Sequence, residues 1–262
     1  MRRLIAFPCG ADTLVGTIDE APGTSGLLIV SGGNEIRIGA HRGMALLAAE
    51  LAERGIPVLR YDRRGIGDST GNNRGFEDEA DDIAAAVAAF RREVPQLARI
   101  VAFGNCDAAS ALALFADGGI DGYVLANPWV IEAADELPPA SAIRARYLDR
   151  LKDPRAWLRL AKGGVDLGKL ARGLKKAAVR PDAPSGLADR VAAGMAAKTM
   201  PITLLIATRD NTAVAFQEAL RSSAFAAARS VALVHERDTS SHSFAKDGDK
   251  AWLFERLMGA VG

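Results

Sequence analysis

The sequence predicts an α/β fold with a mostly parallel sheet of about eight strands. Short apolar, β-branched segments alternate along the chain with alanine-rich segments of helical spacing. This pattern is typical of a parallel sheet covered by helices. The chain has 262 residues, of which 49% are hydrophobic and 25% charged, enough to bury the core of one α/β domain.

The expected elements follow one another in a regular order. The first two strands form a hairpin around the turn PCGAD, and helices and strands then alternate. We expect strands at 4–7, 13–18, 27–31, 57–62, 99–105, 123–128, 202–208 and 230–234. We expect helices at 41–54, at 77–93, from about 106, around 216–221, and at the end of the chain to about 258.

One segment interrupts this alternation. From 129 to 198 the strand pattern disappears, and the sequence becomes Arg, Lys, Leu and Ala broken by Pro and Gly. We therefore expect a core of residues 1–128 and 199–262, with a helical cap at 129–198 inserted after strand 6. Residues 130–198 hold 14 Lys and Arg against 8 Asp and Glu. This basic segment either favours an anionic substrate or forms a solvated face whose long side chains cover apolar helix sides.

The charge of the whole chain gives no reason to expect a nucleic acid or a membrane surface as partner, because the formal net charge is +1. The N-terminal apolar run breaks at Pro8 and Gly10, before the core of a signal peptide could form. No segment approaches the ~20 apolar residues that cross a bilayer. We therefore expect a cytoplasmic protein without membrane insertion, in which Cys9 and Cys106 are free thiols.

The segment VAFGNCDAAS places Cys106 between the end of a strand and the start of a helix. A nucleophile on such a turn needs small residues two positions before and two after it, and Gly104 and Ala108 meet this need. Unpaired N–H groups at the start of the helix would stabilise a thiolate. The alternative is a buried, inert cysteine that only fills space, and position alone leaves both interpretations open.

Two distant residues favour the nucleophile. The expected chain order is nucleophile, acid, histidine, and His41 precedes Cys106, which leaves His235 and His242. His242 lies in a polar loop between the last strand and the last helix, whereas His235 follows the strand directly and is expected to be structural. Asp210 follows an apolar strand, where an acid would accept the Nδ1–H bond of the histidine, although a lone Asp there is otherwise a turn residue or cap. Together these residues predict a Cys-His-Asp triad.

Two backbone N–H groups are expected to form an oxyanion hole. Asp107, the residue after the nucleophile, supplies one of them. The other comes from the loop SGGNEIRIG, with Gly33 or Asn34 as the donor. A glycine-rich loop after a strand also suggests phosphate binding, but neither GxGxxG nor a Walker pattern is present.

Polar residues near these loops have two possible roles. Arg37 and His41 follow the glycine-rich loop and could bind a carboxylate or phosphate of the substrate, or simply remain solvated at the start of a helix. The segment YDRRGIGDSTG is expected to be a structural loop, in which Asp62, Arg64 and Ser69 satisfy backbone groups. The few histidines and cysteines show no metal-ligand spacing, so we expect no metal or organic cofactor.

Several stretches resemble a known family: GGNEIRIGAHR, LRYDRRGIGDSTG, RGFEDEADDI, GNCDAAS, LANPWV, RDNTA and SSHSF, within residues 27 to 250. They are similar to the α/β-hydrolase superfamily, and more closely to the exosortase A system-associated hydrolase 1 family. That family has cysteine where serine is usual, so the resemblance implies a nucleophile at Cys106, an acid at Asp210 and a base at His242. It also implies a link to bacterial exopolysaccharide and PEP-CTERM protein-sorting systems. The chain departs from the family in GGNE, where proline and glutamine are commoner after the glycines, and in SSHSF, where DHTF is commoner.

These residues predict a hydrolase that cleaves an ester or thioester through an acyl-cysteine intermediate. The substrate would be a small-molecule, lipid-linked or saccharide-linked acyl compound. Because the acyl-enzyme is a thioester, acyl transfer to a hydroxyl or amine is the alternative within the same class. The rival from another class is a non-catalytic binding partner with the same fold.

Overall fold

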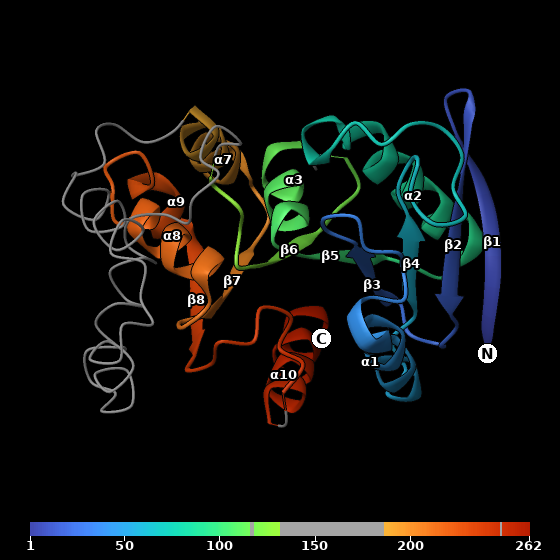
Figure 1. The fold of residues 1–262 in the computed structure, drawn as a ribbon. Helices are drawn as coiled ribbons and strands as arrows, with labels where there is room; N and C mark the ends of the chain where they lie inside the picture. The colour runs from blue at the N-terminus through green and yellow to red at the C-terminus, as the bar shows by residue number, and fades with distance from the viewer. Residues whose placement is uncertain (116–117, 132–185, 247) are drawn as a thin grey trace, which may run out of the picture.

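An eight-stranded sheet forms the centre of the protein, in the order β1-β2-β4-β3-β5-β6-β7-β8 (Figure 1). The computed structural model describes residues 1–115, 118–131, 186–246 and 248–262. The strands are β1 (Arg2–Cys9), β2 (Asp12–Asp19), β3 (Ser25–Val30), β4 (Val58–Asp62), β5 (Arg99–Asn105), β6 (Gly122–Ala126), β7 (Ile202–Ala207) and β8 (Ala232–Arg237). The predicted α/β fold is confirmed.

The sheet is parallel except at its N-terminal edge. β2 pairs antiparallel with both β1 and β4, and every other neighbouring pair runs parallel. The hairpin of β1 and β2 turns at Gly10, which has a φ of 60°. Because β3, β5, β6 and β7 run parallel, their carboxyl ends meet at one edge of the sheet, where open α/β sheets bind ligands.

Helices cover both faces of the sheet. The longer helices are α1 (Gly43–Glu53), α2 (Ala80–Glu93), α3 (Asp107–Phe115), α7 (Gly186–Ala197), α8 (Asn211–Leu220), α9 (Ala226–Val231) and α10 (Asp249–Val261). α1 and α10 lie on one face, and the other helices lie on the opposite face (Figure 1). β5 supplies both cores, because Val101 and Phe103 point to the α1 side while Ile100 and Ala102 point to the other.

The first helix starts later than expected. We predicted a helix from His41, but His41 and Arg42 have φ angles of 52° and 62°, in the left-handed region. They end a short 3₁₀ turn, Ala40–Arg42, and α1 begins at Gly43. The predicted stop at Gly55 is correct, with α1 ending at Glu53.

Two other boundaries differ from the prediction for local reasons. α8 begins at Asn211 rather than near Phe216, because the Asp210 side chain caps it. The last strand begins at Ala232 rather than Ser230, because α9 continues to Val231. In both places, residues that the sequence pattern assigns to a loop or a strand belong to a helix in the structure.

The predicted cap at 129–198 is described only at its ends, since residues 132–185 lie outside the described residues. α7, near the end of this segment, packs closely on α3. A Cβ on Gly194 would lie 2.3 Å from the Ala113 carbonyl oxygen, and Val191 and Met195 are fully buried. α7 therefore belongs to the helical layer of the core. No helix in the described parts of the chain is both long and apolar enough to cross a membrane.

Candidate active site

Cys106 occupies a tight turn between β5 and α3. Its φ is 64°, in the left-handed region that is costly for a residue with a Cβ. The Cys106 N–H donates to the Ala126 carbonyl at 2.9 Å, and the Trp129 N–H donates to the Cys106 carbonyl at 3.1 Å. Gly104 is required, since a Cβ there would lie 2.7 Å from the Ala108 carbonyl carbon. The turn therefore has the strained geometry expected of a strand-to-helix nucleophile position.

His242 and Asp210 form a hydrogen-bonded pair beyond the carboxyl ends of the strands. His242 Nδ1 lies 2.9 Å from Asp210 Oδ2. The same oxygen accepts the N–H groups of Thr212 and Ala213, both at 3.1 Å. Asp210 is therefore both the N-cap of α8 and the partner of His242, and the two cap bonds hold its carboxylate in place.

His242 and Cys106 line the same cavity, and Asp210 binds the His242 ring at Nδ1, so the structure places the three predicted residues near one another. The hydrogen bond to Asp210, followed by the interaction with Cys106, raises the pKa of His242 to about 10, although burial opposes this shift. His242 is therefore protonated at neutral pH. Since Nδ1 is occupied by Asp210, Nε2 is the ring nitrogen left for the sulfur.

Asn127, which the sequence interpretation did not single out, joins three strand ends. It is fully buried and has a φ of 44°. Its Nδ2 donates to Asn105 Oδ1 at 3.1 Å and to the His242 carbonyl at 3.0 Å, and its Oδ1 accepts the Ala207 N–H at 2.8 Å. The signal in the sequence is an amide at the end of an otherwise apolar strand. Asn127 thus fixes the His242 backbone relative to β5 and β7.

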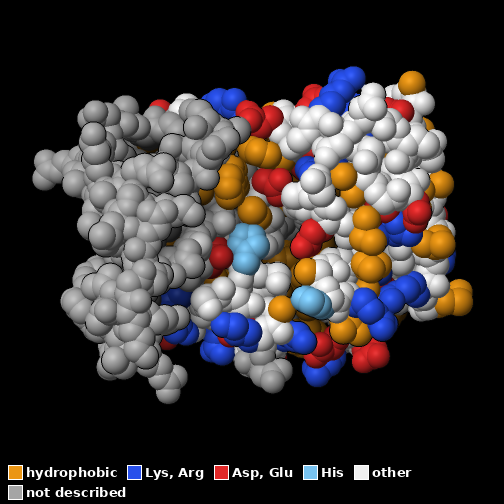
Figure 2. All heavy atoms as spheres, viewed as in Figure 1, with side chains coloured by type: hydrophobic (Ala, Val, Ile, Leu, Met, Phe, Trp, Pro, Cys, Tyr) orange, Lys and Arg blue, Asp and Glu red, His pale blue; other side chains and the backbone are white. Residues whose placement is uncertain are grey.

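A cavity of about 380 Å³ opens beside Cys106 and His242. Its walls come from the loop after β3, the first part of α1, the loop after β8 and the start of α10. Its apolar lining consists of Val30, Met44, Leu46, Leu47, Phe103, Phe244 and Leu253 with small alanine and glycine residues. Figure 2 shows histidine side chains beside hydrophobic ones on the face that it draws, with acidic side chains nearby. A cavity of this size and character accommodates a small organic group.

The predicted oxyanion loop contacts the residue after the nucleophile through a side chain. The Gly33 N–H donates to Asp107 Oδ1 at 2.7 Å. A Cβ on Gly32 would lie 2.5 Å from the same oxygen, so the carboxylate fills the space against the loop. The Asp107 N–H is at the first turn of α3, where no preceding helical turn supplies an acceptor. One expected donor is therefore engaged by a carboxylate in this conformation.

The structure places only some of the other predicted binding residues at the cavity. His41 and Gly33 line the cavity, whereas Asn34 and Arg37 are not among its lining residues. Asn34 Oδ1 accepts from Asn73 Nδ2 at 2.9 Å. The Asn34 side chain thus faces Asn73, and the role of the Asn34 backbone N–H as an oxyanion donor stays a prediction.

Arg37 is held away from the cavity by its own partners. Its guanidinium pairs with Asp62, with Asp68 at 2.9 Å, and with Thr17 Oγ1 at 3.0 Å. Its N–H donates to Asp62 Oδ1 at 2.6 Å. Arg37 thus ties the loop after β3 to β4, and its side chain is neither part of the cavity lining nor solvated, the two roles left open for it by the sequence. Ser69 Oγ donates to the Asp62 carbonyl at 2.6 Å, which confirms the structural role predicted for that loop.

The described residues contain no group of three or more His, Cys, Asp or Glu side chains arranged to hold a metal ion.

A sequence model of the alpha/beta hydrolase family matches residues 27–254 of the chain. The chain belongs to the alpha/beta hydrolase family. The match extends from β3 into α10 and includes Cys106, Asp210 and His242. The predicted superfamily is thereby confirmed, and the closer resemblance to the exosortase A system-associated hydrolase 1 family stays a prediction.

Solved structures share the fold of this alpha/beta hydrolase at low sequence identity. The esterase Pf2001 of Pyrococcus furiosus is 17% identical, with a TM-score of 0.67 over 100% of this chain and 94% of that one. The proline iminopeptidase of Mycobacterium smegmatis is 17% identical, with a TM-score of 0.62 over 98% of each chain. The thioesterase domain of the curacin biosynthetic pathway is 14% identical, with a TM-score of 0.61 over 99% of each chain. No curated protein sequence matches this alpha/beta hydrolase.

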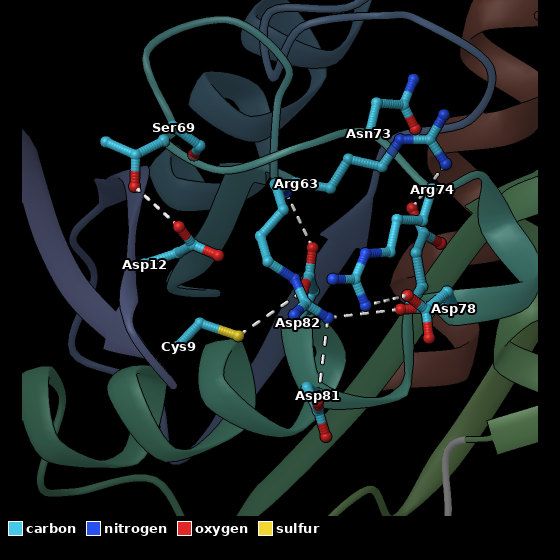
Figure 3. Close-up of polar contacts among 12 residues, drawn as sticks. Cys9, Asp12, Arg63, Ser69, Asn73, Arg74, Asp78, Asp81 and Asp82 are labelled. Atoms are coloured by element: carbon cyan, nitrogen blue, oxygen red, sulfur yellow. Dashed lines mark hydrogen bonds and ion pairs between the residues drawn. The ribbon is translucent and has the colours of Figure 1, made fainter.

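The second cysteine of this alpha/beta hydrolase lies in a different environment. Figure 3 shows Cys9 directed at Asp82, which also pairs with Arg64. The Cys9 Sγ lies 3.5 Å from Asp82 Oδ1, and the thiol is 4% exposed. Burial, followed by the negative charge of Asp82, raises the pKa of Cys9 to about 11. Cys9 is therefore an unreactive thiol at neutral pH.

Proposed function

We propose that this protein hydrolyses an ester or thioester through a Cys106-His242-Asp210 triad and an acyl-cysteine intermediate. The observation that carries the proposal is the hydrogen bond of His242 to Asp210, with His242 and the strained Cys106 lining the same mainly apolar cavity. A histidine oriented by a carboxylate and directed at a thiol is the arrangement that nucleophilic catalysis requires.

In the first half of the reaction, the imidazolium of His242 pairs with the Cys106 thiolate, which attacks the carbonyl carbon of the substrate. The bond between that carbon and the leaving oxygen or sulfur then breaks, and His242 Nε2 gives its proton to the leaving group. The acyl group remains on Cys106 as a thioester. Asp210 holds the ring in place through Nδ1.

In the second half, the neutral His242 takes a proton from a water molecule, and the hydroxide formed attacks the thioester. The carbon–sulfur bond breaks, which releases the carboxylic acid and restores the thiolate–imidazolium pair. Cys106 is one of the two residues whose interactions raise the pKa of His242. Acylation of the sulfur weakens that contribution and favours the neutral base needed here.

The fold neighbours and the family resemblance support the choice of reaction. Two neighbours are described as an esterase and a thioesterase domain. The resemblance of GNCDAAS and LANPWV to the exosortase A system-associated hydrolase 1 family supports the cysteine nucleophile and a role in exopolysaccharide or protein-sorting systems. The cytoplasmic site of action expected from the sequence stays a prediction. The helical cap predicted at 129–198 remains part of this proposal only for the residues before α7, because α7 packs on α3. Transfer of the acyl group to an amine or hydroxyl is the alternative outcome at the same thioester.

Labelling of the native protein tests the nucleophile. Iodoacetamide at pH 7.5 should modify Cys106 at least about tenfold faster than Cys9, because only Cys106 shares its cavity with a protonated histidine. His242→Ala should slow the labelling of Cys106 and leave that of Cys9 unchanged. Equally slow labelling of both cysteines contradicts the enzyme proposal.

A burst experiment tests the acyl-enzyme. 4-Nitrophenyl acetate should release about one equivalent of nitrophenolate rapidly, with acetylation of Cys106 detected by mass spectrometry. Cys106→Ala is the control and should show no burst. Absence of both burst and acetylation in the folded wild type supports a non-catalytic binding protein instead.

A further inference from the structure

The cavity beside Cys106 continues along a groove between two helices. α1 and α10 contact each other on one face of the sheet, and both can be followed below the sheet in Figure 1. From α1 the cavity is lined by Gly43, Leu47 and Glu50, among others. These positions are three or four residues apart and therefore share one face of the helix. The groove thus follows α1 for about 10 Å.

The groove is mainly apolar, and its exposed lining residues are the apolar Leu46 and the charged Glu50 and Lys250, among others. Leu47 and Leu253 face it from the two helices, and Phe103 and Phe244 form its walls near Cys106. Each of these four side chains is less than 9% exposed. Glu50 and Lys250 line the same cavity but are exposed residues. An aliphatic chain lying in the groove would therefore lose its contact with water against the four buried side chains, and would regain it near Glu50 and Lys250.

The part of the substrate that occupies this groove is inferred from the residues that line the cavity. Its lining joins Cys106 and His242 to apolar side chains in one cavity, so a substrate with its carbonyl carbon at Cys106 can extend into this space. The leaving group must lie beside the ring that protonates it, His242. The acyl carbonyl must face the loop after β3, and this loop leads directly into α1. The groove along α1 is therefore on the acyl side of the reacting carbon.

We propose that the groove between α1 and α10 binds the acyl chain of the substrate, and that this chain is an alkyl chain about six to ten carbons long, as a length of about 10 Å allows. This inference rests on the proposed function, because it needs the carbonyl carbon at Cys106. Each methylene buried in the groove raises kcat/KM about fourfold. The gain stops where the chain passes Glu50 and Lys250 and returns to water.

Two series of esters test the assignment. With 4-nitrophenyl esters, kcat/KM should rise steadily from acetate to about octanoate and then level off. With acetate esters of alcohols of increasing length, kcat/KM should change less than about threefold in total, because the leaving group lies outside the groove. A flat acyl series, or a steeper dependence on the alcohol than on the acyl chain, overturns the inference.

A pair of variants on α1 provides the second test. Met44 lines the groove, and Ala49 is half-buried on the same helix but does not line it. Met44→Trp should lower the ratio of kcat/KM for octanoate to that for acetate at least about tenfold, whereas Ala49→Trp should leave the ratio and the acetate activity unchanged. Circular dichroism melts establish that both variants are folded. An unchanged ratio in Met44→Trp overturns the inference.

The experiments distinguish a wrong assignment of the groove from a wrong catalytic proposal. Turnover of acetate with no dependence on acyl length refutes the groove alone. No turnover, no burst and no acylation of Cys106 with any ester refutes the proposed function, and the groove proposal falls with it. Octanoate as an added competitor gives an independent readout, since it should protect Cys106 of the wild type from iodoacetamide more than butyrate does.

Discussion

The Gly33 N–H donates to the carboxylate of Asp107 at 2.7 Å, so two residues expected to stabilise an oxyanion instead contact each other. A backbone N–H that already serves a carboxylate stabilises a developing oxyanion less than a free one does. A negative charge close to that oxyanion also opposes its formation. The proposed reaction therefore requires the Asp107 side chain to leave the Gly33 N–H.

Asp107→Asn tests this relationship. The amide oxygen can still accept from Gly33, but the charge is removed, so acylation of Cys106 should become about threefold to tenfold faster. The rate of the 4-nitrophenyl acetate burst measures it. Glu35→Gln removes an exposed carboxylate that lines the cavity and does not accept the Gly33 N–H, and it serves as a comparison. A slower burst in Asp107→Asn would mean that the carboxylate is needed to hold the loop after β3.

Asn127→Ala should impair both stability and reactivity. It leaves the buried Ala207 N–H without its acceptor and frees the His242 carbonyl, which should cost about 2 kcal/mol in the free energy of unfolding. Urea unfolding measures this loss, and the rate of Cys106 labelling should fall at least about tenfold as His242 loses its position. Asn127→Gly controls for the φ of 44°, since glycine tolerates it. Labelling at the wild-type rate in both variants would show that Asn127 does not position His242.

The raised pKa of His242 predicts a pH-dependent contribution to stability. The folded-state pKa is about 10 and the unfolded value 6.5. The folded protein therefore holds this proton more tightly, and the stabilisation is fully present below pH 6.5 and lost as the pH rises through 10. The difference in the free energy of unfolding between wild type and His242→Gln should shrink from pH 6.5 to pH 10, measured by urea unfolding. A difference that does not depend on pH would be incompatible with this charged pair.

Two glycines should respond to alanine in opposite directions. A Cβ on Gly104 would meet the backbone of Ala108 at 2.7 Å, so Gly104→Ala should destabilise the protein by about 1–3 kcal/mol and slow Cys106 labelling. A Cβ on Gly259 in α10 would meet nothing within 4 Å, so Gly259→Ala should stabilise it by about 0.5–1 kcal/mol. Thermal denaturation of the pair measures both effects. Equal changes in thermal stability in the two variants would contradict the strained turn at Cys106.

Much of the fold could be predicted from the sequence because local patterns carry it. The central strands β3 to β7 are short apolar segments whose side chains are buried on both faces, and this pattern is visible in the sequence without knowledge of their neighbours. Boundaries were less predictable. The start of α8 depends on the Asp210 side chain, and the start of α1 depends on two residues with positive φ, which no apolar pattern reveals.

The fold class and the chain order of Cys106, Asp210 and His242 were predictable because both follow from local residue types and their spacing. Which side chains contact one another depends on how the elements pack in three dimensions. Asn127 reaches His242 across 115 positions, Gly33 reaches Asp107 across 74, and Arg37 pairs with Asp62 rather than facing the cavity. These contacts join segments that are brought together by the parallel sheet, and their geometry depends on packing that no local pattern encodes.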